Sequence, residues 1–380
     1  MQGVPEQFSA LMSSIKDIGR TGSGGYRRFA WTREDAQLRE WFVAEAAARG
    51  GDVTTDRAGN LWAWWGDPDA DGPGVVVGSH LDSVPEGGAY DGPLGVVSSL
   101  LAVDAVRSRL RTPVAVACFA DEEGARFGTA CAGSRLLTGA LEPARALGLK
   151  DADGTTMGEA RDDVPAADHE TLRRIGCFVE LHVEQGRALE VPVGLATEIW
   201  PHGRWRFDLH GQANHAGTTR LEDRSDAVLL AAQLAVAVRR HADELGLLAT
   251  VGKLRVSPNA VNAVPGLVQA WLDARAPSED LLQQLLERLG GDPSEESFTR
   301  AVRFDTELAT RLQTALDGVP LLPTGAGHDA GVLQEHGIPT AMLFVRNPTG
   351  ISHAPEEHAE LDDCLAGVAA LEKVLLELAG

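Results

Sequence analysis

The chain has 380 residues, of which 44% are hydrophobic and 23% charged, and its formal net charge is −21. The composition is that of an ordinary globular protein, and the length favours two domains over a single core. The acidic balance argues against nucleic acid or an anionic membrane as a partner, because both are bound by basic patches. No apolar stretch approaches the roughly 18 residues of a membrane span. Residues 1–6 lack the basic and apolar regions of a signal peptide, so none is expected.

Strands and helices alternate through the first half of the chain. A capping-box pattern at Thr32 and a stop at Gly50 predict a helix between them. Residues 150–169 are polar and without clear period, which indicates a long excursion. The other elements expected here are strands at 60–65, 74–78, 113–120 and 176–182 and a helix at 94–109. This alternation predicts an α/β layer, with ligands bound at the C-terminal ends of its strands.

The pattern changes near residues 192–201, and a second block follows. Its expected elements are strands at 205–211, 249–256 and 266–275 and helices at 226–245 and 278–289. The block predicts an inserted α+β domain at 199–303. The catalytic domain is then expected in two parts, 1–198 and 304–380, as a mixed sheet flanked by helices.

The four cysteines are scattered and form no CxxC pair. Cys118 and Cys177 lie in apolar, strand-like runs and are interpreted as buried free thiols. We therefore expect a cytoplasmic protein.

The stretch 78–93 follows the apolar run 75–77 and contains His80, Asp82 and Asp91. Side chains two residues apart in an extended segment point the same way, so His80 and Asp82 can converge. The Gly-rich loop can bring Asp91 to the same place. A neutral imidazole beside two carboxylates is typical of a metal site. The alternative is three polar residues in a solvated loop.

Further polar clusters follow other expected strands. Glu122 and Glu123 face different directions at a strand end, so one can bind metal while the other faces substrate, although such a run is usually a solvated strand end. His182 alone is as compatible with a hydrogen-bonded core histidine as with a metal ligand. His353 lies in a loop after an expected strand, and the cluster at 325–330 could be only a tight helix entry.

Together these clusters supply enough ligands for two metal ions. A carboxylate shared between the ions, with two further ligands on each, requires five residues. Such sites hold the ions ~3.5–4 Å apart and activate a bridging water. The five candidates are His80, Asp91, Glu123, His182 and His353.

In these motifs and their order the chain resembles the hydantoinase/carbamoylase branch of the aminoacylase/carboxypeptidase metallohydrolases. That branch includes N-carbamoyl-L-amino acid hydrolases, ureidopropionases and allantoate amidohydrolases, and the similarity runs from Gly19 to the C-terminal helix. The resemblance implies a metal-dependent exopeptidase-like catalytic domain with two divalent ions per subunit, zinc or manganese, with cobalt or nickel also compatible. It further implies that the inserted domain is a lid and forms a homodimer.

The resemblance also implies roles for individual residues. Asp91 would bridge the two ions, and Asp82 would orient His80. Glu122 would be the general base, which takes a proton from the bridging water and later gives one to the leaving nitrogen. Peptide-cleaving relatives usually carry a carboxylate where this chain has His182, which favours the carbamoylase branch.

Substrate contacts are implied at five positions. Gln185 and His215 correspond to residues that contact the amide or carbamoyl group, with His215 polarising the carbonyl oxygen. Asn262 and Arg275 correspond to residues that hold the substrate carboxylate, to which the planar fork of arginine is suited. Without the resemblance, Arg275 would be interpreted as an exposed strand residue. Ser352 stands where several relatives have glycine. Because three of these residues lie on the inserted domain, catalysis is expected to need lid closure.

The motifs and the resemblance predict a metal-dependent amidohydrolase that cleaves a linear carbon–nitrogen bond. Its substrate would be a small carboxylated molecule, an N-carbamoyl-L-amino acid or allantoate. Alternatives on the same scaffold are an N-formyl- or N-acyl-amino acid amidohydrolase and a dipeptidase, and His182 and Gln185 argue against the dipeptidase. More remote is a non-catalytic binder of carboxylated ligands, which would be expected to lose Glu122 or a metal ligand. A purely structural role would leave the polar clusters unexplained.

Overall fold

The computed structural model describes residues 3–380, and the chain divides into two compact units. The first unit comprises Met1–Thr197 and Arg303–Gly380, and the second comprises Glu198–Val302. The second unit is therefore an insertion between two parts of the first.

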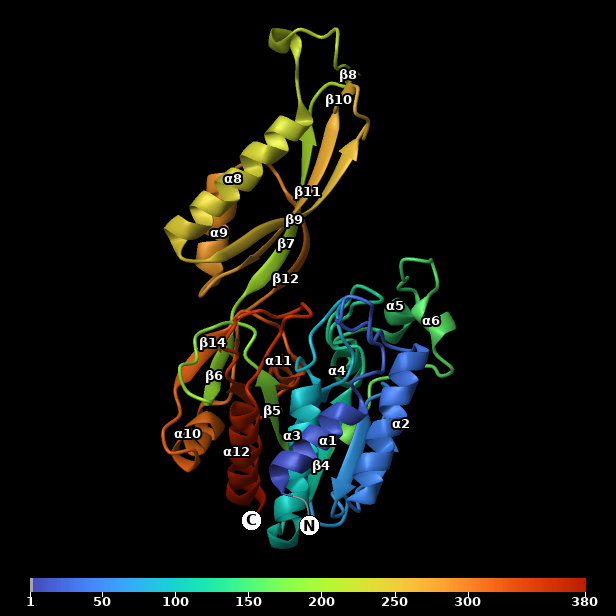
Figure 1. The fold of residues 1–380 in the computed structure, drawn as a ribbon, viewed down its shortest axis with the longest axis vertical. Helices are drawn as coiled ribbons and strands as arrows, with labels where there is room; N and C mark the ends of the chain where they lie inside the picture. Colours follow the sequence, from blue (N-terminus) through green and yellow to red (C-terminus); the bar gives the residue numbers. More distant parts are fainter. Residues whose placement is uncertain (1–2) are drawn as a thin grey trace. The chain divides into compact units, whose positions relative to one another are not determined.

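A nine-stranded mixed sheet forms the centre of the first unit (Figure 1). Its strands are β1 Asp52–Thr55, β2 Leu61–Trp65, β3 Gly74–His80, β4 Val114–Phe119, β5 Ile175–Val183, β6 Val193–Ile199, β13 Val302–Arg303, β14 Leu321–Thr324 and β15 Thr340–Val345. Their order is β1-β2-β4-β3-β5-β15-β6-β13, with β14 beside β6. The central strands β4, β3, β5 and β15 run parallel. They are buried almost throughout, as is usual for parallel strands covered on both faces.

Helices cover both faces of this sheet. They are α1 Val4–Ser14, α2 Arg33–Ala48, α3 Pro93–Val106, α4 Ala132–Thr138, α5 Pro143–Leu147, α6 Met157–Ala160, α7 His169–Arg173, α10 Thr306–Ala315, α11 Asp329–Glu335 and α12 Leu361–Ala379. Helices α1, α2, α3, α10 and α12 share one hydrophobic core with Leu181 of β5. Because side chains alternate along a strand, Glu180 and His182 point to the opposite face. There α11 lies against β5, and the N–H of Ala330 donates to Glu180.

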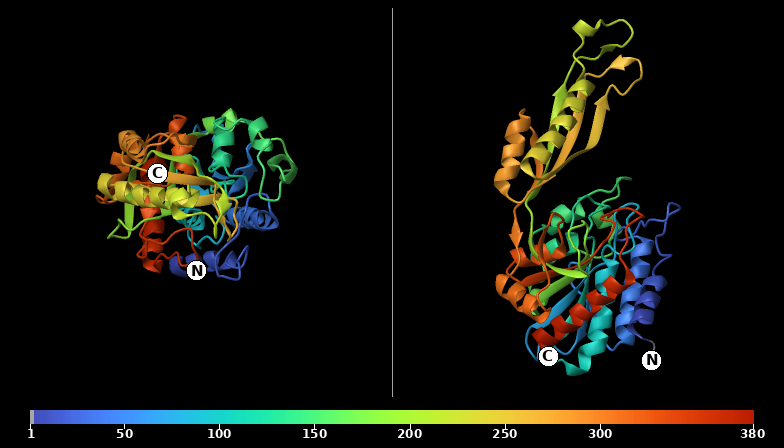
Figure 2. Two further views of the ribbon diagram at one scale, coloured as in Figure 1. Left: turned by 90° about the horizontal axis from the view of Figure 1, so that it is seen from above. Right: turned by 60° about the vertical axis from the view of Figure 1, so that its left-hand side comes forward.

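The second unit is a four-stranded antiparallel sheet with two helices on one face (Figure 2). Its sheet has the order β12-β7-β11-β9. The elements are β7 His202–His210, β8 Asn214–His215, α8 Ala227–Leu245, β9 Leu248–Ser257, β10 Ala263–Val264, β11 Leu267–Arg275, α9 Glu279–Leu289 and β12 Ser294–Thr299. Strands β8 and β10 form a separate two-stranded ribbon. Trp205, Phe207, Leu234 and Leu282 belong to the core between sheet and helices. Asp226 caps the N-terminus of α8, where its side chain accepts the N–H of Val228.

The fold class agrees with the prediction, and the differences concern individual elements. The segment near residues 192–201, where the sequence pattern changes, forms β6, a largely buried strand that pairs with β15. The polar stretch at 150–169 contains the helix α6, which begins with a capping box at Thr156. The helix expected at 94–109 is α3, which ends at Val106, and a 3-10 turn follows it at Arg107–Arg109. Among the elements without a counterpart in the prediction are α1, β1 and β12.

All four cysteines are free, and Cys118 is buried whereas Cys177 is partly exposed. Among residues 3–380, no helix combines the length and the apolar character that crossing a bilayer requires.

Candidate metal centre

Five polar side chains converge at the carboxyl ends of the parallel strands. His80 is the last residue of β3, and His182 lies near the end of β5. Asp91 lies in the loop after β3, Glu123 follows β4, and His353 follows β15. The carboxyl ends of neighbouring parallel strands meet at one edge of a sheet, which brings these distant segments together.

The five residues form two groups that share Asp91. His80, Asp91 and His182 form the first group, and Asp91, Glu123 and His353 form the second. In the first group, Nε2 of His182 and Nε2 of His80 lie 3.1 and 3.5 Å from Asp91 Oδ1. In the second, Nε2 of His353 lies 3.4 Å from Asp91 Oδ2 and 3.6 Å from Glu123 Oε2. One oxygen of Asp91 therefore faces each group, as in a carboxylate that bridges two metal ions.

The donor atoms of these residues fit divalent metal ions. Nδ1 of His80 lies 3.1 Å from the backbone oxygen of Asp82, and Nδ1 of His182 lies 2.8 Å from that of Val183. A carbonyl oxygen only accepts, so each Nδ1 carries a hydrogen, and Nε2 is the ring atom left to face Asp91 and a metal ion. Within the described part of the chain, both Nε2 atoms and Glu123 Oε1 are buried without a hydrogen-bond partner. Such orphaned atoms are costly, and a mixed imidazole and carboxylate set suits zinc-like ions.

Asp91 is ionised in spite of its burial. Burial opposes the charge, but the imidazoles of His182, His353 and His80 outweigh it and hold the pKa of Asp91 well below its ordinary value. Burial, followed by the charge of Asp91, raises the pKa of Glu123 to about 7. The site therefore concentrates carboxylates that a cation would stabilise in their charged form.

Asp82 holds the segment that carries both glutamates. Its Oδ1 accepts the N–H of Glu122 at 3.1 Å, and its Oδ2 accepts the N–H of Glu123 at 3.0 Å. Its carboxylate also lies 3.5 Å from Nδ1 of His80. The shorter contact to that imidazole comes from the backbone oxygen of Asp82. Asp82 thus contacts His80 mainly through its backbone and fixes the end of β4 through its side chain.

Glu122 lies beside the ligands without belonging to either group. Its Oε2 is 3.9 Å from Nε2 of His80, and its Oε1 is 3.9 Å from Nδ1 of His328. Burial raises the pKa of the Glu122 carboxyl well above its ordinary value, although His80 opposes the shift. A carboxyl group with a raised pKa holds a proton more tightly than an ordinary one, which suits a group that accepts a proton and then returns it.

Three residues of the site hold left-handed backbone conformations. The φ angles are 53° at Asp121, 54° at Cys131 and 57° at His353. Non-glycine residues rarely adopt this region, and each instance costs of the order of 1–3 kcal/mol. Pairing with neighbours maintains two of them, because the N–H of Cys131 donates to Glu122 O and the N–H of Ala132 to Asp121 O. The strained turn fixes the direction in which Glu122 leaves the strand end.

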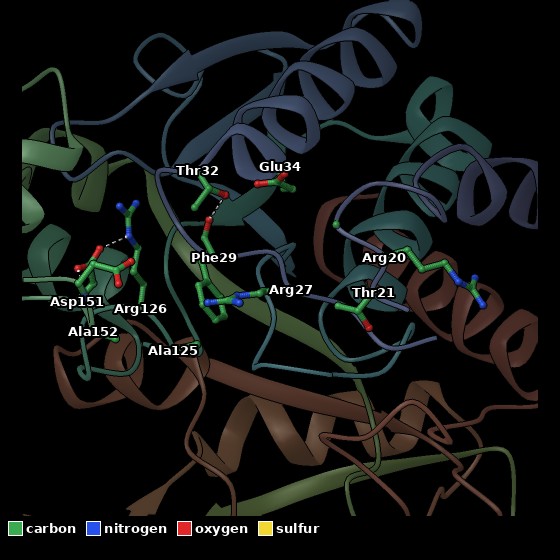
Figure 3. A pocket seen from close by; sticks show the side chains of 12 residues that line it. Arg20, Thr21, Arg27, Phe29, Thr32, Glu34, Ala125, Arg126, Asp151 and Ala152 are labelled. Atoms are coloured by element: carbon green, nitrogen blue, oxygen red, sulfur yellow. Dashed lines mark hydrogen bonds and ion pairs between the residues drawn. The ribbon is translucent and has the colours of Figure 1, made fainter. Parts of the chain in front are cut away.

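A pocket of about 420 Å³ lies beside the loop that follows Glu123 (Figure 3). Three chain segments line it, and Arg126 joins them. Nη1 of Arg126 donates to the backbone oxygens of Ala30 and Trp31 at 2.9 and 2.8 Å. Its Nε donates to Asp151 Oδ2 at 3.2 Å. Arg126 therefore ties the loop of the proposed ligand Glu123 to two neighbouring segments.

Two predicted substrate residues reach Asp91. Nε2 of Gln185 donates to Asp91 Oδ2 at 2.8 Å and lies 3.2 Å from Nε2 of His353. The hydroxyl of Ser352 lies 3.3 Å from the same Asp91 oxygen. Both side chains thus lie at the second group, and Ser352 contributes a hydroxyl that glycine would lack.

The other three predicted substrate residues belong to the second unit. His215 lies in β8 and pairs with Ala263 of β10. Asn262 directly precedes β10, and its backbone oxygen accepts the N–H of Ala216. Arg275 ends β11, where its Nε donates to Asp273 Oδ1 at 3.1 Å. The unit therefore brings His215 and Asn262 together in the small ribbon and places Arg275 at the far end of β11.

His328 was not among the predicted site residues. It precedes α11, so the expected helix entry at 325–330 is present. Its ring also lies against that of His182 in a tilted arrangement, with the ring centroids 4.6 Å apart. Burial, with the neighbouring His182, lowers the pKa of His328 well below its ordinary value, so the imidazole is neutral. Both of its ring nitrogens are buried without a hydrogen-bond partner in the described chain. The Gly-rich sequence around it signalled the turn, whereas the direction of the ring depends on the tertiary fold.

Known proteins resemble the chain along nearly its whole length. A family model, Peptidase family M20/M25/M40, matches residues 76–377. An N-carbamoyl-L-amino acid amidohydrolase from Geobacillus stearothermophilus is 33% identical over 98% of each chain. An allantoate amidohydrolase from Escherichia coli (strain K12) is 29% identical over 96% of each. Among solved structures, an amidase of the hydantoinase/carbamoylase family from Burkholderia multivorans matches with a TM-score of 0.85 and 31% identity, covering 99% of this chain and 98% of its own.

Proposed function

This chain belongs to peptidase family M20/M25/M40. From that membership and from its similarity to named amidohydrolases, we propose that it is a metal-dependent amidohydrolase acting on non-peptide carbon–nitrogen bonds. The substrate is a small carboxylated N-carbamoyl or ureido acid, because the similar proteins are named for N-carbamoyl-L-amino acids and allantoate. The observation that carries the proposal is the pair of imidazole and carboxylate groups that share Asp91, with Glu122 beside them.

Two divalent ions, zinc or manganese, are proposed to bind per chain, one in each of the two groups. When bound, the ions polarise the scissile carbonyl and lower the pKa of the attacking water. Imidazole and carboxylate ligands also accept cobalt or nickel, so the metal in the cell depends on availability as well as on these residues.

Glu122 is the proposed general base and acid. Its carboxylate takes a proton from the attacking water and then delivers a proton to the leaving nitrogen. Asp82 supports this role by holding the backbone N–H of Glu122 at 3.1 Å. The neutral imidazole of His328, 3.9 Å from Glu122 Oε1, lies where it can hydrogen-bond that carboxylate or the substrate.

The variant Glu122→Gln tests this role because it keeps the side-chain size and removes the proton acceptor. Ammonia release from N-carbamoyl amino acids should fall by about 10²–10⁴-fold, while the metal content stays at the wild-type level. Glu335→Gln, at an exposed position, is the matched control and should retain full activity. Activity of Glu122→Gln within about threefold of the wild type would contradict the assigned role.

We propose that the protein forms a homodimer through its second unit. Helix α8 carries Leu229 and Val236, which are 59% and 69% exposed and lie two turns apart on one face. Strand β9 is an open edge of the sheet, and its Leu254 is exposed as well. Exposed apolar side chains beside an unpaired strand edge are typical of an interface between chains.

The spacing of the proposed substrate residues supports a dimer. His215 and Asn262 lie at the end of β11 that begins with Leu267, and Arg275 lies at its other end. At a rise of 3.4 Å per residue these ends are about 27 Å apart. A small carboxylated substrate cannot contact both ends in one chain. If all three residues bind the same substrate, a second copy must supply one end.

Mixing two inactive variants tests this arrangement. His215→Ala and Arg275→Ala homodimers should each be nearly inactive. Subunit exchange between them should restore activity, up to about a quarter of the wild-type activity per chain, because half of the dimers are mixed and half of their sites are intact. The lack of any recovery, with exchange demonstrated by mass spectrometry, would contradict the proposal that the two residues come from different chains.

A cytoplasmic location is also proposed. All four cysteines are free thiols, which suits a reducing compartment. Fractionation of cells expressing the tagged protein tests it, and recovery in an extracytoplasmic fraction would contradict it.

A further inference from the structure

Glu357 is a buried carboxylate that contacts the loops of two proposed ligands at once. It lies between β15 and α12 and is only 5% exposed. Its Oε1 accepts the backbone N–H of Tyr90 at 2.8 Å and that of Asp91 at 2.9 Å. Its Oε2 accepts the hydroxyl of Ser352 at 3.1 Å. Glu357 therefore joins the loop that presents Asp91 to the loop that presents His353.

These contacts restrain the direction of the shared ligand. Backbone N–H groups that donate to a carboxylate form charge-assisted hydrogen bonds, roughly twice as strong as neutral ones. Both N–H groups bound by Glu357 belong to the turn that aims Asp91 between the two metal groups. The hydroxyl of Ser352 lies between Glu357 and Asp91 Oδ2, at 3.1 and 3.3 Å, so it can donate to either carboxylate. Glu357 thus holds the backbone of Asp91 directly and its side chain through the hydroxyl of Ser352.

The chain leaves room for this carboxylate at Gly88. A Cβ atom at position 88 would lie 2.3 Å from both Cδ and Oε1 of Glu357. Contacts that short do not occur between non-bonded carbon and oxygen atoms, so any other residue there would displace Glu357. The backbone of Gly88 lies outside the left-handed region, so space, not conformation, requires glycine at this position.

We propose that Glu357 is a positioning residue that assembles the second metal group by clamping the Asp91 loop to the His353 loop. This inference rests on the proposed metal-dependent function. The second group depends on the clamp more than the first does. His353 is 48% exposed and lies on a loop, whereas His80 and His182 are fully buried on strands. Loss of the clamp should therefore release the ion of the second group first.

Metal binding by four variants tests the proposal. Outer-shell partners of metal ligands typically contribute about 10–100-fold to metal affinity. In Glu357→Ala the affinity for one ion should fall by that factor, whereas the other ion stays bound. Wild type is expected to hold about two ions, one per group. Dialysis against a weak chelator should therefore lower the metal content of Glu357→Ala to about one ion per chain. Glu357→Gln keeps an oxygen that accepts both N–H groups and should stay within several-fold of wild type. Gly88→Ala should reproduce the loss. Glu356→Ala, at the exposed neighbouring position, is the matched control.

Kinetics and stability give the second readout. In Glu357→Ala, saturating metal should restore most of kcat without changing KM, because the side chain does not contact substrate in this role. Thermal unfolding of the metal-free proteins shows which variants fold. If Glu357→Ala does not fold, Gly88→Ala decides the matter.

The inference would be overturned if Glu357→Ala bound each of the two ions as tightly as wild type does. If only Gly88→Ala folds, the same comparison is made between Gly88→Ala and wild type. An equal loss in Glu356→Ala would overturn the inference too. A wild-type protein that binds no metal would contradict the proposed function itself, so the two failures are distinguishable.

Discussion

Replacing Asp82 with asparagine should reduce both stability and catalysis, although the side chain hardly changes in size. The two oxygens of Asp82 accept the N–H groups of Glu122 and Glu123 at 3.1 and 3.0 Å. Asparagine offers one acceptor oxygen, and its NH2 group faces the other N–H without being able to accept. A hydrogen bond to a charged group contributes about 1.5–3 kcal/mol, and an unpaired buried N–H costs about 1–3 kcal/mol. We expect the free energy of unfolding to fall by about 3 kcal/mol.

Catalysis should fall with it, because the same N–H groups fix the proposed base and one proposed ligand. A decrease of about 10–100-fold in kcat/KM is expected from the loss of an outer-shell partner. Urea unfolding of the metal-free protein measures the first effect, and ammonia release at saturating metal measures the second. The matched control is Asp162→Asn, at an exposed position, which should change stability by less than about 0.5 kcal/mol. If Asp82→Asn matched that control in both assays, the role given to its carboxylate would be wrong.

Three further predictions concern other parts of the chain. Arg275→Lys should raise KM for carbamoyl acids at least about tenfold with little change in kcat, because lysine lacks the planar fork; an unchanged KM in steady-state kinetics would exclude a carboxylate contact. Burial raises the pKa of Asp35 from 3.8 to about 6, so its ionised form destabilises the fold above pH 6 and this penalty is relieved as the pH falls toward 4. The free energy of unfolding of Asp35→Asn relative to wild type should therefore rise by up to about 2 kcal/mol between pH 4 and pH 7, as measured by chemical unfolding. A difference between the two proteins that does not change with pH would count against the raised pKa of Asp35. Glutamate at both Leu229 and Val236 should give a monomer by light scattering, and a persisting dimer would place the interface elsewhere.

The convergence of the proposed metal ligands was predictable because local sequence and topology point to the same place. Apolar runs mark the buried strands, and parallel strands deliver whatever follows them to one edge. His80 and His182 lie at strand ends, and the neighbouring Asp91 lies in a Gly-rich loop. Their convergence therefore follows from the strand assignments, without knowledge of distant contacts.

The residues that support the ligands were not predictable in the same way. Glu357 contacts Tyr90 and Asp91 across more than 260 positions of sequence, and no periodicity signals such a pair. His328 reads locally as a helix entry, and only the packing of α11 against β5 turns its ring toward His182.

Two of the missed strands, β6 and β12, escaped prediction for opposite reasons. The strand β6 is largely buried, but it follows a turn-rich stretch and resembles a boundary. The strand β12 lies at a sheet edge with nearly every side chain exposed, so it lacks the alternation that marks a strand. Both strands can be identified only from their pairing with neighbouring strands in the structure.

Ammonia release by metal-stripped and then zinc- or manganese-reloaded protein is the most direct test of the proposed activity. The assay uses a panel of N-carbamoyl amino acids and allantoate, with formyl, acetyl and dipeptide substrates followed by release of the free amino acid. We expect no turnover by the stripped protein and, after reloading, preferential cleavage of a carbamoyl or ureido substrate. Equal turnover without metal, or preferential cleavage of dipeptides, would contradict the proposed function.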